Sequence, residues 1–293
     1  MKLLKHKIVF IVNPISGGKS KMQLPSLIDT YLNHKIFDAS IIFSEYVGHA
    51  YLLAKQALQH GADIVTSVGG DGTINEVASA IVHSGKQMGI IPCGSGNGLA
   101  RTLKISLNHI KAIKNINNLN VTCIDTAELN GKNFFNMAGL GFDAHISALF
   151  AKDKTRGLKG YIKSIFNQIS TYKPQHYTLE LDGKTIQLQA FMLSIANSSQ
   201  YGNNVYIAPE ASLCDGMLDV CVVKPFPLYS IAALGWRMLN KTAQHSAYIH
   251  ITKAQKVKII RHITGPVHLD GEPYHMGKEI TIKINPLSLS LIT

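Results

Sequence analysis

The strongest chemical signal in the sequence is a glycine-rich segment, Gly69-Gly70-Asp71-Gly72-Thr73-Ile74-Asn75-Glu76. Its glycines can adopt positive φ angles and allow the backbone to approach a ligand closely. An apolar run typical of a buried strand precedes the segment, and an amphipathic pattern typical of a helix follows it. Because backbone amides at the start of a helix favour anions, this arrangement predicts a phosphate site.

Asp71 stands in the middle of this loop, which is predicted to bind phosphate. A bare carboxylate would repel phosphate, so we expect Mg²⁺ and its waters to join Asp71 to the phosphates. The alternative interpretation is an ordinary Asp-Gly turn with a helix cap. The GGDGT pattern between a strand and a helix favours the functional interpretation.

Two further loops carry glycine, one at Pro92-Cys93-Gly94-Ser95-Gly96-Asn97-Gly98 and one at Asn13-Pro14-Ile15-Ser16-Gly17-Gly18-Lys19-Ser20. The spacing of the former does not fit the dinucleotide pattern GxGxxG. The latter is one glycine short of a P-loop, because Asn13 stands at the first required glycine, although Ser16 and Lys19 still suit a phosphate. Loops at the carboxyl ends of neighbouring parallel strands share a crevice, so the three loops together predict a nucleotide cleft.

Strand and helix patterns alternate in the first third of the chain. The predicted strands cover 8–12, 39–43, 63–68 and 88–91, and the predicted helices cover 24–32, 49–58 and 73–83. This alternation implies a mostly parallel sheet with helices on both faces. We expect His49 to have a structural role at the start of its helix.

Beyond about residue 120 the pattern changes to period two. Apolar residues alternate before Asp182-Gly183 and again before Asp270-Gly271, and both positions predict hairpin turns. The later chain is therefore predicted to be largely antiparallel, with helical insertions near 157–169 and 228–240.

Composition sets broad limits on the class of protein. The chain has 293 residues, 46% of them hydrophobic and 16% charged, which indicates a globular protein of two domains or one large one. Its formal charge of +11 suits phosphates of nucleotides, nucleic acid or anionic lipid headgroups. Four cysteines without a CxxC pair argue against a disulfide scaffold, and no zinc-binding spacing occurs. We interpret the basic, then apolar N-terminus as a first strand rather than a signal peptide, and expect a cytoplasmic protein.

The motifs resemble the diacylglycerol kinase catalytic-domain family, which includes sphingosine and ceramide kinases and bacterial YegS-like lipid kinases. The resemblance extends into the C-terminal half, and the GGDGT motif alone is shared with NAD kinases and phosphofructokinases. The Asn75-Glu76 extension, the GSGN loop and the late DGE narrow the choice to lipid kinases. The matching segments are 13–17, 69–77, 92–101, 139–143, 208–211, 215–219 and 269–273.

The resemblance implies an α/β plus all-β fold. A Rossmann-like nucleotide-binding domain at 1–123, joined by the returning segment 283–293, would precede an antiparallel β-sandwich at 124–282. It also implies that ATP, with Mg²⁺, donates its γ-phosphoryl group to the hydroxyl of a lipid such as diacylglycerol or a sphingoid base. The bacterial relatives suggest a homodimer. Here Gly98-Leu99 replaces the acidic and aromatic residues of many bacterial members, which leaves the acceptor lipid open.

The resemblance also assigns roles to residues. Asp270 and Glu272 match the catalytic DGE and are expected to face the nucleotide and Asp71. The resemblance leaves open which of the two is the general base. Asp215, with backbone carbonyls near Ser212 and Met217, matches a structural Mg²⁺ site, and Asp71 would meet the nucleotide's metal. The residues expected to hold ATP are Asn13, Pro14, Ser16, Gly17, Ser44, Gly69, Gly70, Asp71, Gly72, Thr73, Asn75, Gly94, Ser95, Gly96 and Asn97.

Two segments bear on membrane contact. A helix with basic residues at 152, 154, 156, 159 and 163 is predicted either to lie on anionic lipid, making the protein peripherally membrane-associated, or to present a solvated face. The apolar residues Leu228, Ile231, Ala232, Leu234 and Trp236 are expected in the core or in the wall of an acceptor tunnel.

Three other functions compete with the lipid kinase. An NAD kinase shares GGDGT and a two-domain plan, and a non-catalytic lipid-binding relative would keep the fold. A nucleic-acid-binding protein would explain the charge, but the single tryptophan and the absence of a recognised binding motif argue against it, so we expect no nucleic-acid partner.

Overall fold

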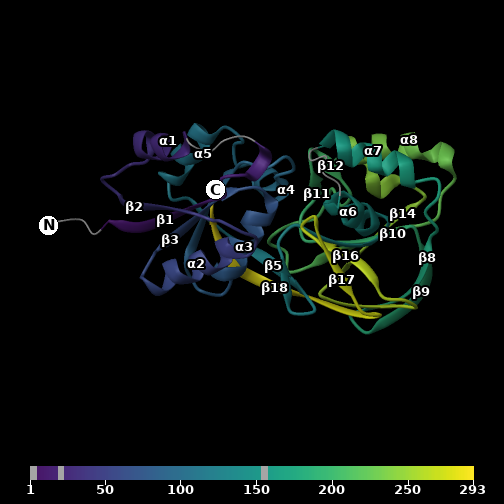
Figure 1. Ribbon diagram of the computed structural model, residues 1–293. Coiled ribbons are helices and arrows are strands. Elements are labelled where there is room, and N and C mark those ends of the chain that lie inside the picture. Colours follow the sequence, from purple (N-terminus) through teal and green to yellow (C-terminus); the bar gives the residue numbers. More distant parts are fainter. Residues whose placement is uncertain (1–4, 19–22, 153–157) are drawn as a thin grey trace. The chain divides into compact units, whose positions relative to one another are not determined.

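A computed structural model describes residues 5–18, 23–152 and 158–293 (Figure 1). Its contacts divide the chain into two units, which are described separately below. The first unit comprises residues 1–124 and 287–293, and the second comprises residues 125–286. The boundaries expected from the sequence lie at 123/124 and 282/283.

The first unit contains a parallel sheet in the order β2-β1-β3-β4, to which the end of β18 is added beside β4. The strands align at their carboxyl ends, because Val12 of β1 lies opposite both Phe43 and Val68, and Gly69 lies opposite Pro92. The strands are β1 (His6–Val12), β2 (Phe37–Phe43), β3 (Ile64–Gly69), β4 (Gln87–Pro92) and β18 (Glu279–Ile292).

Two pairs of helices cover this sheet. Helix α1 packs against α5, and α2 packs against α3, with the pairs on opposite faces of the sheet in Figure 1. The predicted α/β alternation is therefore confirmed, with element ends displaced by one or a few residues. The helices of the first unit are α1 (Leu24–Tyr31), α2 (His49–Gln59), α3 (Asp71–Ile81), α4 (Gly98–Thr102) and α5 (His109–Ile116), with a 3₁₀ turn η1 (Ser16–Gly18).

The second unit contains two sheets that share one core. Leu140, Leu193 and Val220 from one sheet pack with Leu179 and Ile259 from the other. Two sheets packed face to face form a sandwich, as the family resemblance implies. One sheet has the order β14-β13-β10-β7-β16-β17, and the other joins the first part of β18 to β15, β8 and β9, with β5 and β6 attached.

The bounds of these strands are β5 (Val121–Leu129), β6 (Lys132–Phe134), β7 (Met137–Gly141), β8 (Gln175–Leu181), β9 (Lys184–Ala190), β10 (Met192–Ala196), β13 (Leu218–Val223), β14 (Ile249–Ala254), β15 (Lys256–Arg261), β16 (Gly265–Leu269) and β17 (Glu272–Met276). A small hairpin adds β11 (Gln200–Gly202) and β12 (Val205–Tyr206). The helical insertions are α6 (Phe142–Lys152), α7 (Leu158–Gln168) and α8 (Ile231–Leu239), with short turns η2 (Leu228–Ser230) and η3 (Ala243–His245).

Both predicted hairpins are present. Asp182-Gly183 connects β8 to β9 with φ angles of 47° and 86°, and Asp270-Gly271 connects β16 to β17 with φ angles of 49° and 90°. Two-residue turns with positive φ at both positions suit the twist of antiparallel strands, which explains the Asp-Gly pairs.

The expectation that the apolar segment near α8 lies in the core is wrong for most of its residues. Leu234 is buried, but Leu228 is 55% exposed and Trp236 is 62% exposed. A short helix turns only one narrow stripe toward its neighbours, so the remaining apolar residues face solvent. No helix in the described part of the chain is both long and apolar enough to cross a membrane.

Candidate functional site

The predicted nucleotide loops follow the carboxyl ends of neighbouring strands in the first unit. We call residues 13–18 the first loop, 69–75 the second loop and 92–98 the third loop; they follow β1, β3 and β4. Ser44 follows β2, where its N–H donates to the carbonyl of Val12 (2.9 Å). The chain leaves β1 for β2 on one side and returns to β3 on the other, so the topological switch point lies between β1 and β3. Open α/β sheets bind their ligands at such a point.

Glycines allow the three loops to touch through their backbones. A Cβ atom added at Gly17 would lie 2.1 Å from the carbonyl oxygen of Cys93, and one at Gly94 would lie 2.6 Å from Cα of Gly70. Gly17 also has a φ of 64°, which disfavours other residues. The glycines of three separate motifs are therefore required for one assembly, a relationship that no single motif reveals.

Asn13 attaches the first loop to the start of α3. Its Nδ2 donates to Oγ1 of Thr73 (3.0 Å), and its Oδ1 accepts from the amide of Ile15 (3.1 Å). A glycine here, as in a P-loop, would lose both contacts. Lys19 and Ser20 of the same motif lie outside the described residues.

Asp71 attaches the second loop to the third. Its Oδ2 accepts from the amide of Asn97 and its Oδ1 from the amide of Gly98, both at 2.8 Å. A Cβ atom added at Gly96 would lie 2.9 Å from Oδ2 of Asp71. The sequence analysis expects Mg²⁺ to offset the charge of this carboxylate; in the structure two backbone amides donate to it as well.

Asn97 organises the third loop from within. It adopts a left-handed conformation with a φ of 53°, which asparagine tolerates. Its Oδ1 accepts from the amide of Gly94 (2.9 Å), and its Nδ2 donates to the carbonyl of the same residue (2.7 Å). Ser95 is left exposed at the outside of this turn, where a ligand can reach its hydroxyl.

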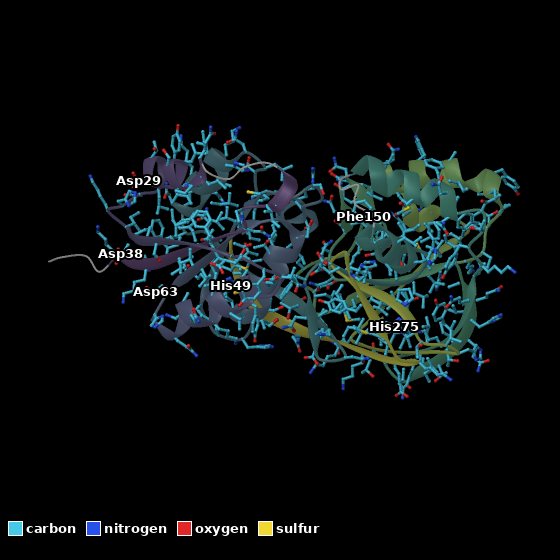
Figure 2. The ribbon with its side chains drawn as sticks, viewed as in Figure 1. Asp29, Asp38, His49, Asp63, Phe150 and His275 are labelled. Atoms are coloured by element: carbon cyan, nitrogen blue, oxygen red, sulfur yellow. The ribbon has the colours of Figure 1, made fainter. Side chains whose placement is uncertain are left out.

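The Asn75-Glu76 extension has a structural role that sequence reasoning missed. Glu76 accepts hydrogen bonds from the amides of Gly48 (2.8 Å) and Ala50 (3.0 Å) at the start of α2. A carboxylate there also interacts favourably with the helix dipole. His49, labelled in Figure 2, begins α2 and stacks on Tyr46 with ring centroids 4.5 Å apart, in keeping with its expected structural role.

Asp270 of the second unit is an anchored carboxylate. It accepts three backbone hydrogen bonds, from Phe135 (3.0 Å), Asn136 (2.8 Å) and Met137 (3.0 Å). Its own amide donates to the carbonyl of Met137 (2.8 Å). These contacts fix the β16–β17 turn against the segment that enters β7.

Glu272 differs from Asp270 in its exposure to solvent. It is the first residue of β17, opposite Leu269, and it is exposed. The two acids of the DGE motif therefore have different surroundings, one held by the backbone and one open to solvent.

A buried Asp–His pair lies behind this turn. Nε2 of His268 is 3.1 Å from Oδ2 of Asp143, and the hydroxyls of Ser194 and Tyr201 donate to the same oxygen at 3.2 Å. The amide of Gly271 lies 3.4 Å from Nδ1 of His268. A neutral imidazole protonated at Nε2 satisfies both contacts. The GLGFD motif and a histidine two residues before Asp270 were the only sequence signals of this pair.

The residues expected to hold a structural magnesium ion have a different partner. Nζ of Lys253 forms an ion pair with Oδ2 of Asp215 and lies 3.7 Å from Oδ2 of Asp219. The hydrogen bond that Lys253 donates to Asp215 raises the pKa of Lys253, so the side chain stays charged, and burial raises the pKa of Asp219. An ammonium on the carboxylate does not fit a divalent cation at Asp215. In the described residues, no three His, Cys, Asp or Glu side chains are grouped to hold a metal.

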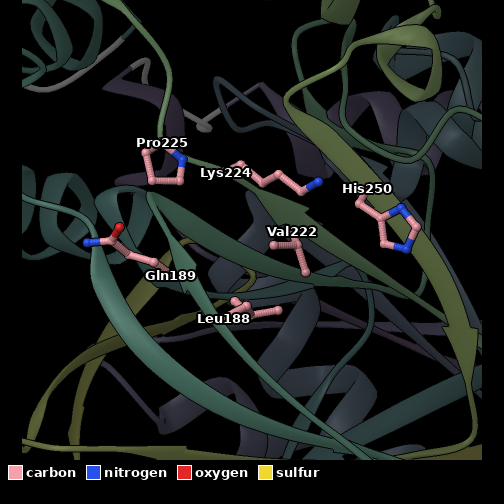
Figure 3. Close-up of a pocket in the computed structure, with 6 residues that line it drawn as sticks. All are labelled: Leu188, Gln189, Val222, Lys224, Pro225 and His250. Carbon is pink, nitrogen blue, oxygen red and sulfur yellow. The ribbon is translucent and has the colours of Figure 1, made fainter.

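A cavity of about 570 Å³ lies at the open edge of the sandwich, between the edge strands β9 and β14 (Figure 3). Its lining residues are Leu188, Gln189, Val222, Lys224, Pro225 and His250. None of them is a predicted site residue, and none carries a carboxylate that could serve as a base. We therefore assign no chemistry to this cavity.

The fold combines an α/β unit that carries three contacting loops with a β-sandwich unit, and comparison with known proteins identifies both. The family descriptions "Diacylglycerol kinase catalytic domain" and "YegS C-terminal NAD kinase beta sandwich-like domain" match residues 7–129 and 136–293. The diacylglycerol kinase of Bacillus subtilis is 29% identical over 268 residues, covering 89% of this chain and 88% of that protein. That of Staphylococcus saprophyticus is 27% identical and covers 92% and 90%.

Solved structures show the same fold. A crystal structure from Bacillus anthracis str. Sterne matches with a TM-score of 0.78 and 25% identity, covering 98% of this chain and 96% of that one. A second structure, of a diacylglycerol kinase from the same strain, has a TM-score of 0.76 and 23% identity, with the same coverage. The chain belongs to the diacylglycerol kinase catalytic-domain family and is a phosphotransferase of the kinase type.

Proposed function

We propose that this protein transfers the γ-phosphoryl group of ATP to the hydroxyl of a lipid such as diacylglycerol or a sphingoid base. The observation that carries the proposal is the mutual contact of three glycine loops at the switch point of a parallel sheet. Such a site suits a polyphosphate, because backbone amides and the start of α3 attract anions. The curated relatives named as diacylglycerol kinases support a lipid acceptor.

The ATP-binding residues predicted from the sequence stay together in this proposal. The glycines bring backbone amides to the phosphates, while Asn13, Ser16, Ser44, Thr73, Asn75 and Ser95 supply polar side chains. Asp71 would help to hold an Mg²⁺ ion, which would supply positive charge to offset that of the triphosphate during phosphoryl transfer. The amides of Asn97 and Gly98 hold the Asp71 carboxylate in place.

We assign the role of general base to Glu272 and that of anchor to Asp270. The lipid oxygen attacks the γ-phosphorus, the bond to the bridging oxygen of ADP breaks, and the hydroxyl proton passes to the Glu272 carboxylate. Glu272 is exposed, so a substrate can reach it. The oxygens of Asp270 already accept three backbone hydrogen bonds that hold the turn.

A panel of acceptors tests the proposed function. Labelled ATP and Mg²⁺ are incubated with diacylglycerol, sphingosine, ceramide and NAD, and the products are identified by mass spectrometry. NAD belongs in the panel because the second family description names an NAD kinase-like domain. A phosphorylated lipid supports the proposal. If NAD is the only acceptor phosphorylated, the protein is an NAD kinase rather than a lipid kinase. If no acceptor is phosphorylated, the result favours a non-catalytic lipid-binding protein.

We further propose that the second unit contacts an anionic membrane surface through α8 and η2. Tyr229, Trp236 and Leu239 are 84%, 62% and 57% exposed. The sequence from 220 to 269 that carries them contains no aspartate or glutamate. Exposed aromatic and aliphatic side chains on a basic segment suit the interface of anionic lipid. The basic helix predicted from the sequence corresponds to α7 and the residues before it. Its contribution to the membrane surface stays a prediction, because Lys154 and Arg156 lie outside the described residues.

Replacing Trp236 and Leu239 with serine together should lower vesicle binding by roughly tenfold or more, because each loses apolar burial worth about 1.5–3 kcal/mol. Sedimentation with phosphatidylglycerol-containing vesicles measures the bound fraction. Ile263→Ser is the matched control, since Ile263 is also 62% exposed but lies between β15 and β16. Equal binding by the double variant and the control variant would refute the α8 surface.

A further inference from the structure

The turn that should hold a structural magnesium ion is built around a lysine. The segment 212–217 precedes β13, and its end is stabilised by Asp125, whose Oδ2 accepts from the amide of Gly216 (2.7 Å). Oδ1 of Asp215 accepts from the amide of Met217 (3.1 Å). Backbone and side-chain bonds within the second unit therefore already shape this turn.

Lys253 reaches the turn from the neighbouring strand. In the antiparallel pair of β13 and β14, Lys253 lies directly opposite Asp219. Its Nζ forms an ion pair with Asp215 and lies 3.7 Å from Oδ2 of Asp219. Because register fixes cross-strand neighbours, the ammonium is delivered to this position by the fold itself.

The buried side chain of Asp219 favours a positive charge at this position. Its side chain is only 4% exposed, and within the described ranges its Oδ2 has no hydrogen-bond partner, only the 3.7 Å ion-pair contact to Lys253. A buried carboxylate without compensation is costly, and in the described part of the chain the cation that faces this one is the ammonium of Lys253. Magnesium requires near-octahedral oxygen ligands at about 2.0–2.1 Å, which an ammonium on the same carboxylate excludes.

We propose that the ammonium of Lys253 takes the place of the structural divalent cation in this chain. The 212–217 turn is then held by an internal ion pair, and folding of the second unit does not depend on magnesium. This inference does not depend on the acceptor lipid or on ATP, because it concerns the stability of the turn.

Thermal unfolding of the full-length protein without nucleotide tests this substitution. For the wild type, Tm should be the same in EDTA and in millimolar Mg²⁺ or Ca²⁺. Lys253→Met keeps the length of the side chain and removes its charge; its Tm should fall in EDTA and recover by roughly 3 °C or more with the metal ion. In Asp215→Asn/Lys253→Met, the recovery should be lost.

Lys258→Met provides the matched control. Lys258 also forms an ion pair within the second unit, with Glu279, so its loss should give no metal-dependent recovery. A metal-dependent rise of the wild-type Tm that Asp215→Asn abolishes would overturn the proposal, as would a Lys253→Met protein that no divalent ion restores.

Direct binding keeps the test independent of how well the variants fold. Mn²⁺ is titrated into the wild type and into Asp215→Asn, and free Mn²⁺ is followed by electron paramagnetic resonance. We expect identical curves. Wild-type binding that depends on Asp215 would contradict the replacement of the cation by Lys253.

Discussion

Glu272→Gln is expected to lower kcat by about 10²–10⁴-fold, the usual contribution of a positioned general base. Glutamine keeps the size and polarity of the side chain but cannot accept the proton of the lipid hydroxyl. Since Glu272 is exposed at the start of β17, the Tm of the variant should stay close to that of the wild type. Steady-state kinetics with saturating lipid measure kcat, and calorimetry measures ATP affinity, which should not change.

Asp270→Asn is the contrasting variant. An amide NH₂ in place of one carboxylate oxygen would face the backbone N–H groups of residues 135–137, leaving at least one buried donor unpaired. Such a loss costs about 1–3 kcal/mol, so Tm and activity should fall together. If Glu272→Gln retains normal kcat, or lowers Tm as much as Asp270→Asn, the division between base and anchor is wrong.

Gly17→Ala is expected to weaken ATP binding by tenfold or more. The new Cβ would lie 2.1 Å from the carbonyl oxygen of Cys93, so the first and third loops must separate. Separation displaces the backbone amides that we assign to the phosphates, and a displacement of about 1 Å at a functional site can cost about 10²-fold. Isothermal titration with ATP and Mg²⁺ measures the change in Kd.

Gly85→Ala separates this clash from backbone strain. Gly85 has a φ of 70°, close to the 64° of Gly17, but no atom lies within 4 Å of its added Cβ. Both variants bear the strain of a left-handed alanine, roughly 1–2 kcal/mol, and only Gly17→Ala should lose ATP affinity. Equal affinities in the two variants would show that contact between the loops does not form the nucleotide site.

Much of the fold could be predicted because its signals are local. Period-two patterns ending in Asp182-Gly183 and Asp270-Gly271 specify hairpins, and buried runs alternating with amphipathic stretches specify the parallel sheet. The position of Trp236 was mispredicted because no local signal determines it. Apolar residues crowd onto a short helix there, and composition does not reveal which of them face the protein.

The site could be predicted as residues but not as contacts. Asp71 meets Asn97 across 26 residues of sequence, Asp143 meets His268 across 125, and Lys253 meets Asp215 across 38. A motif identifies a carboxylate, whereas its partners depend on strand order and register. The distinction between Asp270 and Glu272 likewise rests on three backbone amides that belong to another strand and its approach.

Transfer of an isotopic label tests the central claim most directly. ATP labelled with ¹⁸O on the non-bridging oxygens of its γ-phosphate is incubated with Mg²⁺, the protein and diacylglycerol, and the lipid is examined by mass spectrometry. The account predicts a lipid phosphate monoester that retains all the label, formed by the wild type and far more slowly by Glu272→Gln. Label that appears only in inorganic phosphate, with none in the lipid, would contradict it.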